Sequence, residues 1–88
     1  MYFFELSPKP QTRRMYDRPL EPRDVWRHVR EAGVHNDRFT VLQVGQTFRV
    51  ECLSRQLIDL LHDRLRRLYY VDPVQQKGFE RRRQHIGA

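Results

Sequence analysis

The side chains that could support catalysis are few, and their spacing favours no particular reaction. Asp59, His62 and Asp63 would lie on one face of a helix, where they could form a weak metal or acid–base site or simply face solvent. The sequence has no glycine-rich phosphate loop, no nucleophile elbow and no paired carboxylates across a predicted cleft. We therefore expect no catalytic residue, metal ligand or cofactor, and interpret the chain as a protein that is not an enzyme. A small basic ribonuclease, using arginine, histidine and tyrosine alone, stays as an alternative.

Arginine carries the clearest chemical bias in the sequence. Of the 17 lysines and arginines, 15 are arginine, whose planar guanidinium suits bidentate contact with phosphate and stacking on bases. A GC-rich genome would produce the same preference. The formal net charge of +6 usually indicates a polyanionic partner. The excess lies in the flanks, because residues 1–20 hold four cations against two acids, residues 73–88 hold four against one, and residues 21–72 hold nine against eight.

These biases predict a nucleic-acid-binding module, for RNA rather than DNA. Tyr2 and Phe3 could stack on a base, and Arg49 could contact a phosphate or a base on the surface of a sheet. The remaining predicted contacts are flanking arginines that would follow the phosphate backbone and supply most of the electrostatic affinity: Arg13, Arg14, Arg18, Arg81, Arg82 and Arg83.

A β-hairpin must position the central part of this surface. Residues 39–44 and 47–52 have the β-branched and alternating patterns of strands, and Gly45 and Gln46 between them are typical of a type II′ turn. A two-residue turn here pairs Val41 with Val50. The predicted core face then holds Phe39, Val41, Phe48, Val50 and Cys52, and the opposite face holds Thr40, Leu42, Val44, Thr47, Arg49 and Glu51.

The face opposite the core suggests a second function. It is too apolar for an ordinary solvent-exposed surface and too charged for a second core. It is therefore either a binding surface or an ordinary sheet face that is partly exposed to solvent. The alternative to nucleic-acid binding is therefore a protein-interaction or homodimerisation module. Its candidate residues lie on the hairpin and on a predicted last strand at 68–71: Thr40, Leu42, Val44 and Tyr70.

The other elements can be predicted from their boundary residues. Residues 1–6 are strand-like, residues 8–22 are proline-rich and predicted as a loop, and Pro22 and Gly33 bound a helix. Trp26 in that helix is expected to be a core anchor. Ser54 is the predicted N-cap of a second helix with a stripe of leucines.

Composition predicts an intracellular protein. The single cysteine, Cys52, excludes an internal disulfide and lies on the predicted core face. No apolar run approaches the roughly 20 residues that span a bilayer, and residues 1–20 lack the pattern of a signal peptide. We expect an intracellular location, in the cytoplasm or nucleus, and no membrane contact.

The predicted order is β, α, β, β, α, β, which corresponds to an α+β two-layer sandwich over residues 1–72 with a basic flexible tail over 73–88. This order resembles the RNA-recognition-motif or ferredoxin-like sandwich. Residues 1–6 are similar to the motif on the first strand of the RNA-recognition family, with Tyr2 at its stacking position. Residues 44–49 depart from the second motif, because Gln46 replaces its first aromatic residue and Phe48 points to the core. The helix, glycine-turned hairpin and second helix also resemble Gag-like RNA-binding domains of retroelements.

Overall fold

The hairpin has the predicted register in the computed structural model, which describes residues 1–77. β2 (Thr40–Val44) and β3 (Thr47–Cys52) are antiparallel, and Val41 lies opposite Val50. The turn requires glycine because Gly45 has a φ of 62°. This register turns Phe48 inward, where its side chain is only 3% exposed, so the predicted division between the two faces is confirmed.

β1 (Tyr2–Pro8) lies inside the antiparallel sheet, whose strand order is β2-β3-β1-β4. β1 pairs with β3 along one edge and with β4 (Tyr69–Val71) along the other. A short strand, β5 (Gln75–Gln76), also pairs with β1, opposite Tyr2 and Phe3. The paired chain therefore continues past residue 72, where the folded part was expected to end.

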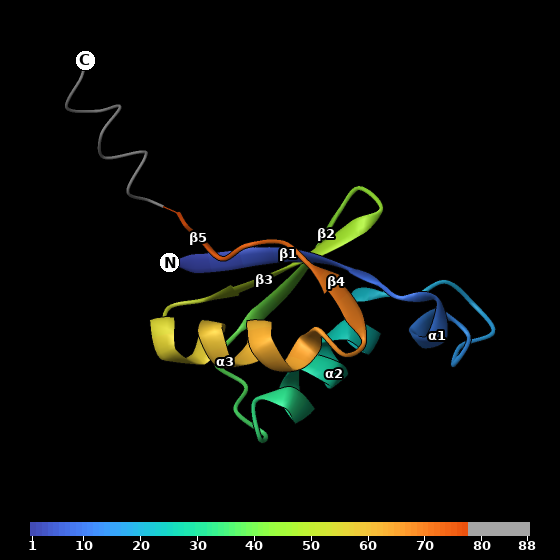
Figure 1. The fold of residues 1–88 in the computed structure, drawn as a ribbon, viewed down its shortest axis with the longest axis horizontal. Coiled ribbons are helices and arrows are strands. Elements are labelled where there is room, and N and C mark those ends of the chain that lie inside the picture. The colour runs from blue at the N-terminus through green and yellow to red at the C-terminus, as the bar shows by residue number, and fades with distance from the viewer. Residues whose placement is uncertain (78–88) are drawn as a thin grey trace, which may run out of the picture.

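Two helices cover one face of the sheet, as Figure 1 shows. α2 (Pro22–Ala32) begins with a capping box between Glu21 and Asp24, and α3 (Arg55–Leu65) begins at Ser54, whose side chain accepts a hydrogen bond from the Leu57 amide. The apolar faces of both helices pack against the inner face of the sheet. The buried core is formed by Phe4, Leu6, Val25, Val29, Phe39, Phe48, Val50, Cys52, Leu57, Ile58, Leu61, Leu65 and Tyr69.

The α+β class is confirmed, but the predicted element order is wrong. A third helix, α1 (Pro10–Arg13), lies within the segment predicted as a loop, and β5 follows β4, so the order is not βαββαβ. α1 is held by Thr12, which is fully buried and donates through Oγ1 to the Leu68 carbonyl over 2.6 Å. This contact fastens the N-terminal flank to the turn after α3. No helix among residues 1–77 is long and apolar enough to cross a membrane.

Trp26 is not the core anchor that the helical spacing predicted. Its side chain is 37% exposed and lies against Phe39, with ring centroids 5.6 Å apart, while the Arg30 guanidinium covers it at 5.7 Å. Val25 and Val29 are fully buried, so they take the core-facing position. Trp26 lies at the edge of that face, as expected for a residue one position further round the helix.

The end of α2 contains backbone strain. Val34 and His35 have φ values of 55° and 63°, in the left-handed region that β-branched residues avoid. The His35 amide nevertheless donates to the Arg30 carbonyl over 2.8 Å, which is the hydrogen bond of a helix-ending motif that normally contains glycine. Gly33 precedes this position and is instead needed for packing, since a Cβ there would lie 3.2 Å from Leu61 Cδ2.

We predict that Val34→Gly stabilises the protein. The left-handed conformation costs a non-glycine residue roughly 1–2 kcal/mol, partly offset by the backbone entropy of glycine. The Val34 side chain is 67% exposed, so little packing is lost. Urea denaturation should give a free energy of unfolding about 0.5–1 kcal/mol higher. Val34→Ala, which keeps a Cβ, is the control, and equal stability of the two variants would contradict the strain.

Candidate nucleic-acid interface

Arg49 lies on the open face of the sheet, as predicted, but its charge is already engaged. Its Nη2 donates to Glu5 Oε2 over 2.7 Å, and its Nη1 lies 3.8 Å from Glu51 Oε2. The guanidinium also covers the Phe3 ring at 4.5 Å from the centroid. Because the side chain is only 22% exposed and two carboxylates neutralise it, the centre of the sheet offers little attraction to phosphate.

The two predicted stacking residues lie on opposite faces of β1. Tyr2 packs partly against the core side, where the Arg55 guanidinium lies 5.4 Å from its ring centroid. Phe3 belongs to the open face and is covered by Arg49. Alternation along a strand requires this separation, so the two rings cannot form one stacking platform.

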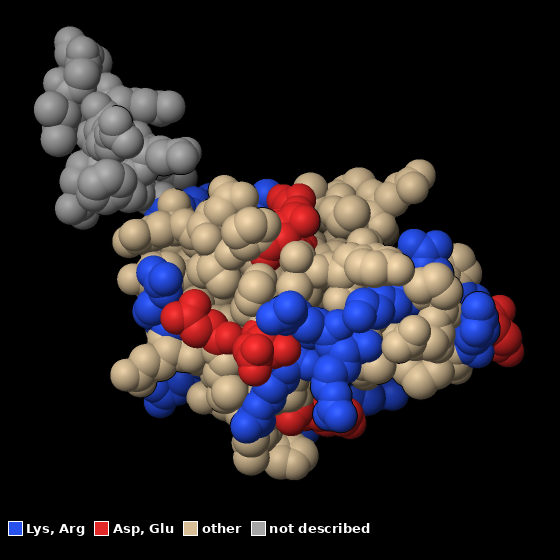
Figure 2. Space-filling view, viewed as in Figure 1, with Lys and Arg blue, Asp and Glu red and all other residues tan. Residues whose placement is uncertain are grey.

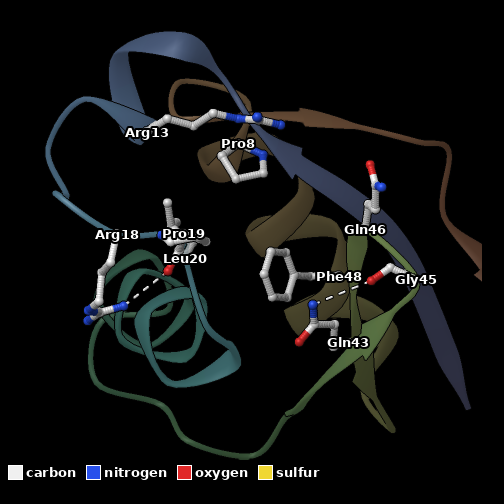
Figure 3. A pocket seen from close by; sticks show the side chains of 9 residues that line it. All are labelled: Pro8, Arg13, Arg18, Pro19, Leu20, Gln43, Gly45, Gln46 and Phe48. Carbon is white, nitrogen blue, oxygen red and sulfur yellow. Dashed lines mark hydrogen bonds between the residues drawn. The ribbon is translucent and has the colours of Figure 1, made fainter.

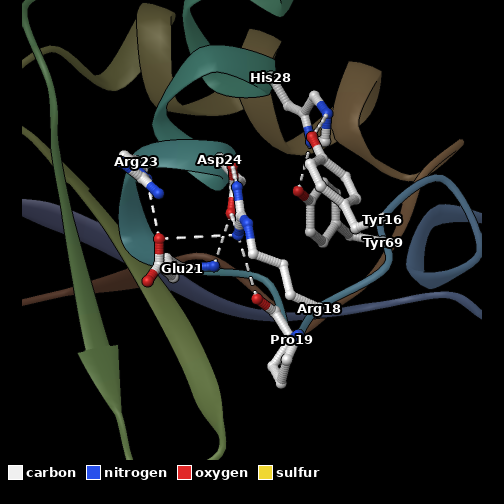
Figure 4. A network of polar contacts seen from close by, with 8 residues as sticks. All are labelled: Tyr16, Arg18, Pro19, Glu21, Arg23, Asp24, His28 and Tyr69. Carbon is white, nitrogen blue, oxygen red and sulfur yellow. Dashed lines mark hydrogen bonds and ion pairs between the residues drawn. The ribbon is translucent and has the colours of Figure 1, made fainter.

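Arg18, itself exposed, forms an ion pair with a buried carboxylate that fixes the loop before α2 (Figure 4). Its guanidinium makes a bidentate contact with Asp24, over 2.7 and 2.9 Å, and Asp24 is 1% exposed. The Asp24 carboxylate also accepts from the Glu21 amide over 2.8 Å. The hydrogen bonds from Arg18 hold the pKa of Asp24 well below its usual range, against the opposing effect of burial. Arg18 therefore orders the N-terminal flank.

A chain of three side chains joins the same loop to the core. The His28 ring lies between two hydroxyls, 2.5 Å from Tyr69 Oη through Nδ1 and 3.1 Å from Tyr16 Oη through Nε2 (Figure 4). Burial lowers the pKa of His28 below its ordinary value and raises the pKa of Tyr69. Both ring nitrogens are occupied, so His28 is a structural histidine and has no free nitrogen for a substrate.

Cations gather instead where α1 meets the end of α3. The Lys9 amide and the Thr12 hydroxyl both donate to the Leu68 carbonyl, and Gln11 Nε2 donates to the Arg67 carbonyl. These bonds bring the arginines of α1 beside those of the α3 terminus, and Figure 2 shows basic side chains grouped over the end of α3. We call this surface the basic end, formed by Arg13, Arg14, Arg64, Arg66 and Arg67.

The basic end differs in its partners from five other cationic side chains, although Lys9, Arg27, Arg30 and Arg38 also have no carboxylate within 4.0 Å among residues 1–77. Arg18, Arg23, Arg49, Arg55 and Lys77 each make an ion pair within 4.0 Å of a carboxylate. None of the arginines of the basic end does so among residues 1–77, although Arg64 donates to the Ala32 carbonyl over 2.8 Å. All five are exposed. Their charge is thus available to an external anion.

A cavity of about 350 Å³ lies next to the basic end (Figure 3). It opens between the β2–β3 turn, the end of β1 and the segment before α2. We call it the turn pocket. Arg13 contributes to both surfaces. The pocket is lined by Pro8, Arg13, Arg18, Pro19, Leu20, Gln43, Gly45, Gln46 and Phe48.

The other predicted site residues are more scattered. Leu42 and Val44 are 40% and 37% exposed on the outer face of β2, with Thr40 exposed beside them, and Tyr70 is 59% exposed on β4 at the other side of the sheet. Lys9 lies 5.6 Å from the Tyr70 ring centroid. Arg81, Arg82 and Arg83 lie outside the described residues.

Sequence patterns missed the contribution of α3 to the cationic surface. Arg66 and Arg67 end a helix predicted from its leucine stripe, and the sequence does not indicate that the arginines of α1 lie beside them. The helical spacing predicts His62 on one face with Asp59 and Asp63, but its ring packs edge-on against Phe4, with ring centroids 5.1 Å apart. Within residues 1–77 no group of three metal-ligating side chains is close enough to hold an ion.

Comparisons with known proteins identify no relative. No family model matches the chain, no curated protein matches it, and no solved structure matches it. The fold and the charged surfaces are therefore the basis for inferring function.

We predict that acid weakens the fold in two steps. The pKa of His28 is lower in the folded state than its ordinary pKa of 6.5. Its contribution to the free energy of unfolding is therefore complete above pH 6.5 and declines as pH falls below that value. The pKa of Asp24 is also lowered in the folded state, so its contribution declines in the same way as pH falls below its ordinary pKa of 3.8. Urea denaturation between pH 8 and 5 should show the first decline in the wild type and a shallower one in His28→Gln, whose amide can still bridge two hydroxyls. An equal slope in both proteins would contradict the assignment to His28.

Proposed function

We propose that this chain is a non-enzymatic nucleic-acid-binding module that holds single-stranded RNA by its phosphates at the basic end. The observation that carries the proposal is the gathering of exposed arginines without carboxylate partners among residues 1–77. Exposed guanidinium groups bind phosphate oxygens in bidentate geometry, and they release counterions when they do. The basic end thus replaces the sheet centre as the main phosphate contact.

Contacts in the fold support this assignment by fixing the two halves of the surface relative to each other. Thr12 is fully buried at its contact with Leu68, so Arg13 and Arg14 are held in place by the core. Arg64 is similarly fixed by its bond to the α2 terminus. Pre-positioned cations lose less conformational entropy on binding than cations on a loose flank.

Single-stranded RNA suits this surface better than a duplex. An exposed arginine cluster beside a pocket suits an unstacked strand, whose phosphates and bases can be contacted separately. The antiparallel order β2-β3-β1-β4 with α2 and α3 on one face also resembles RNA-recognition sandwiches. The proposed contact is at one end of the fold, however, and not on the sheet face that those domains use.

We predict that Arg66→Ala together with Arg67→Ala weakens binding to a fluorescent octauridylate and reduces its salt dependence. Each phosphate contact on a single strand contributes roughly 0.7 to the slope of log affinity against log salt. Loss of two contacts should therefore reduce the slope by about 1.4. The measurement is fluorescence anisotropy at several salt concentrations between about 50 and 200 mM.

Two controls separate this surface from general charge. Arg23→Ala together with Arg55→Ala removes the same number of cations from ion pairs outside the basic end, and should leave the slope nearly unchanged. Truncation after Lys77 tests the predicted contribution of Arg81, Arg82 and Arg83 while keeping the β5 pairing with β1. An identical slope in the wild type and the Arg66/Arg67 double variant would contradict the proposal.

A second candidate function is self-association through β2. Among residues 1–77 this strand pairs only with β3, so its other edge has backbone groups available for a partner strand. Leu42 and Val44 are exposed beside that edge. A second copy could extend the sheet there, in the manner of β-augmentation.

The self-association candidate predicts a dimer that charges on β2 disrupt. Light scattering during size-exclusion should give a dimer mass for the wild type at micromolar concentration and a monomer mass for the variant with Leu42→Lys and Val44→Lys. Like charges facing each other across a strand pair repel, which accounts for the expected change. A monomeric wild type would exclude this candidate at that concentration.

A further inference from the structure

We propose that the turn pocket accepts one unstacked base of the bound RNA while Arg13 contacts the adjoining phosphate. This inference rests on the proposed function and deepens it, because it states how the protein would distinguish RNA from other polyanions. Arg13 is the shared residue, as it lies in both the basic end and the pocket lining.

The walls of the pocket suit a flat, partly apolar ring. Pro8, Pro19 and Leu20 are apolar parts of the lining, and Figure 3 shows the ring of Phe48 pointing toward Pro19 and Leu20. Phe48 is 3% exposed, so its position is fixed by the core. A volume of about 350 Å³ lies at the lower end of the range for small-ligand sites, about 300–1,000 Å³, and is suitable for a single nucleotide.

Two amides provide hydrogen-bonding groups beside these apolar walls. Gln43 and Gln46 lie on either side of the turn, and both are exposed. Gln43 Nε2 makes only a long contact of 3.4 Å with the Gly45 carbonyl, and no hydrogen bond from the Gln46 side chain occurs within the described residues. A carboxamide both donates and accepts, which matches the alternating groups on a base edge.

The charges at the pocket favour a nucleotide over a neutral ligand. Arg18 also lines the pocket, but its guanidinium is held by Asp24. Arg13 has no carboxylate within 4.0 Å among residues 1–77, and Figure 3 shows its side chain extended over Pro8 at the rim. The cation at the rim would contact the phosphate, and the amides near the turn would contact the base. Proteins that bind single strands use separate groups for these two contacts in the same way.

The test compares octauridylate with an abasic octamer of the same length, which keeps the phosphates and lacks the bases. Anisotropy should give the wild type at least about 5-fold tighter binding to octauridylate, because stacking and pocket contacts add to the phosphate term. Gln46→Ala should reduce this ratio while leaving the affinity for the abasic octamer unchanged. Arg13→Ala should weaken binding to both oligomers. Arg14→Ala, the neighbouring control, should weaken binding to octauridylate less than Arg13→Ala does.

The outcomes separate this inference from the proposed function. Equal affinity of the wild type for both oligomers, with a normal salt slope, would overturn the base pocket and leave phosphate binding at the basic end intact. Absence of binding to either oligomer would overturn both. Amide chemical shifts of the Gln46→Ala variant that match the wild type outside the turn show that its fold is preserved. If the ratio persists in that folded variant, the base lies elsewhere and the inference is wrong.

Discussion

Alternation along the central strands is the constraint on which this structure depends. Phe4 and Leu6 on β1, with Phe48 and Val50 on β3, must all face α2 and α3 to complete a small core. The same register places Glu5, Arg49 and Glu51 together on the opposite face. A shift by one residue would exchange the two faces and bury three charges. The inward position of the aromatic residues therefore fixes which face of the sheet holds the charged side chains.

This arrangement explains why the open face is a poor place for an anion. Arg49 has carboxylates on both sides, and Lys77 lies 3.6 Å from Glu51 on the same face. A phosphate bound here would have to break these ion pairs and would lie close to the carboxylates of Glu5 and Glu51. The arginines at the junction of α1 and α3 carry no such cost, because none of them has a carboxylate within 4.0 Å among residues 1–77. The register of the strands accounts for the neutralised charge at the sheet, whereas the contacts of α1 with the turn after α3 account for the cations at that end.

The sequence was sufficient for features that depend on local chemistry. The turn at Gly45 required a positive φ, and the alternation on either side of it was strict, so the hairpin and the inward position of Phe48 followed. Features that depend on distant contacts could not be predicted in this way. α1 is four residues long and has no periodicity, and it is stable because Thr12 reaches Leu68, 56 positions away. Arg18 resembled a loop cation because the burial of Asp24 cannot be inferred from spacing alone.

The position of the RNA on the fold can be measured most directly by amide chemical shifts of the isotope-labelled full chain during titration with octauridylate at low salt. Our account predicts that the largest shifts fall at residues 13–14 and 64–68, with smaller ones at the β2–β3 turn and little change at Phe3, Leu42 and Arg49. Shifts concentrated across Phe3, Leu42 and Arg49 would place the nucleic acid on the sheet and contradict the account.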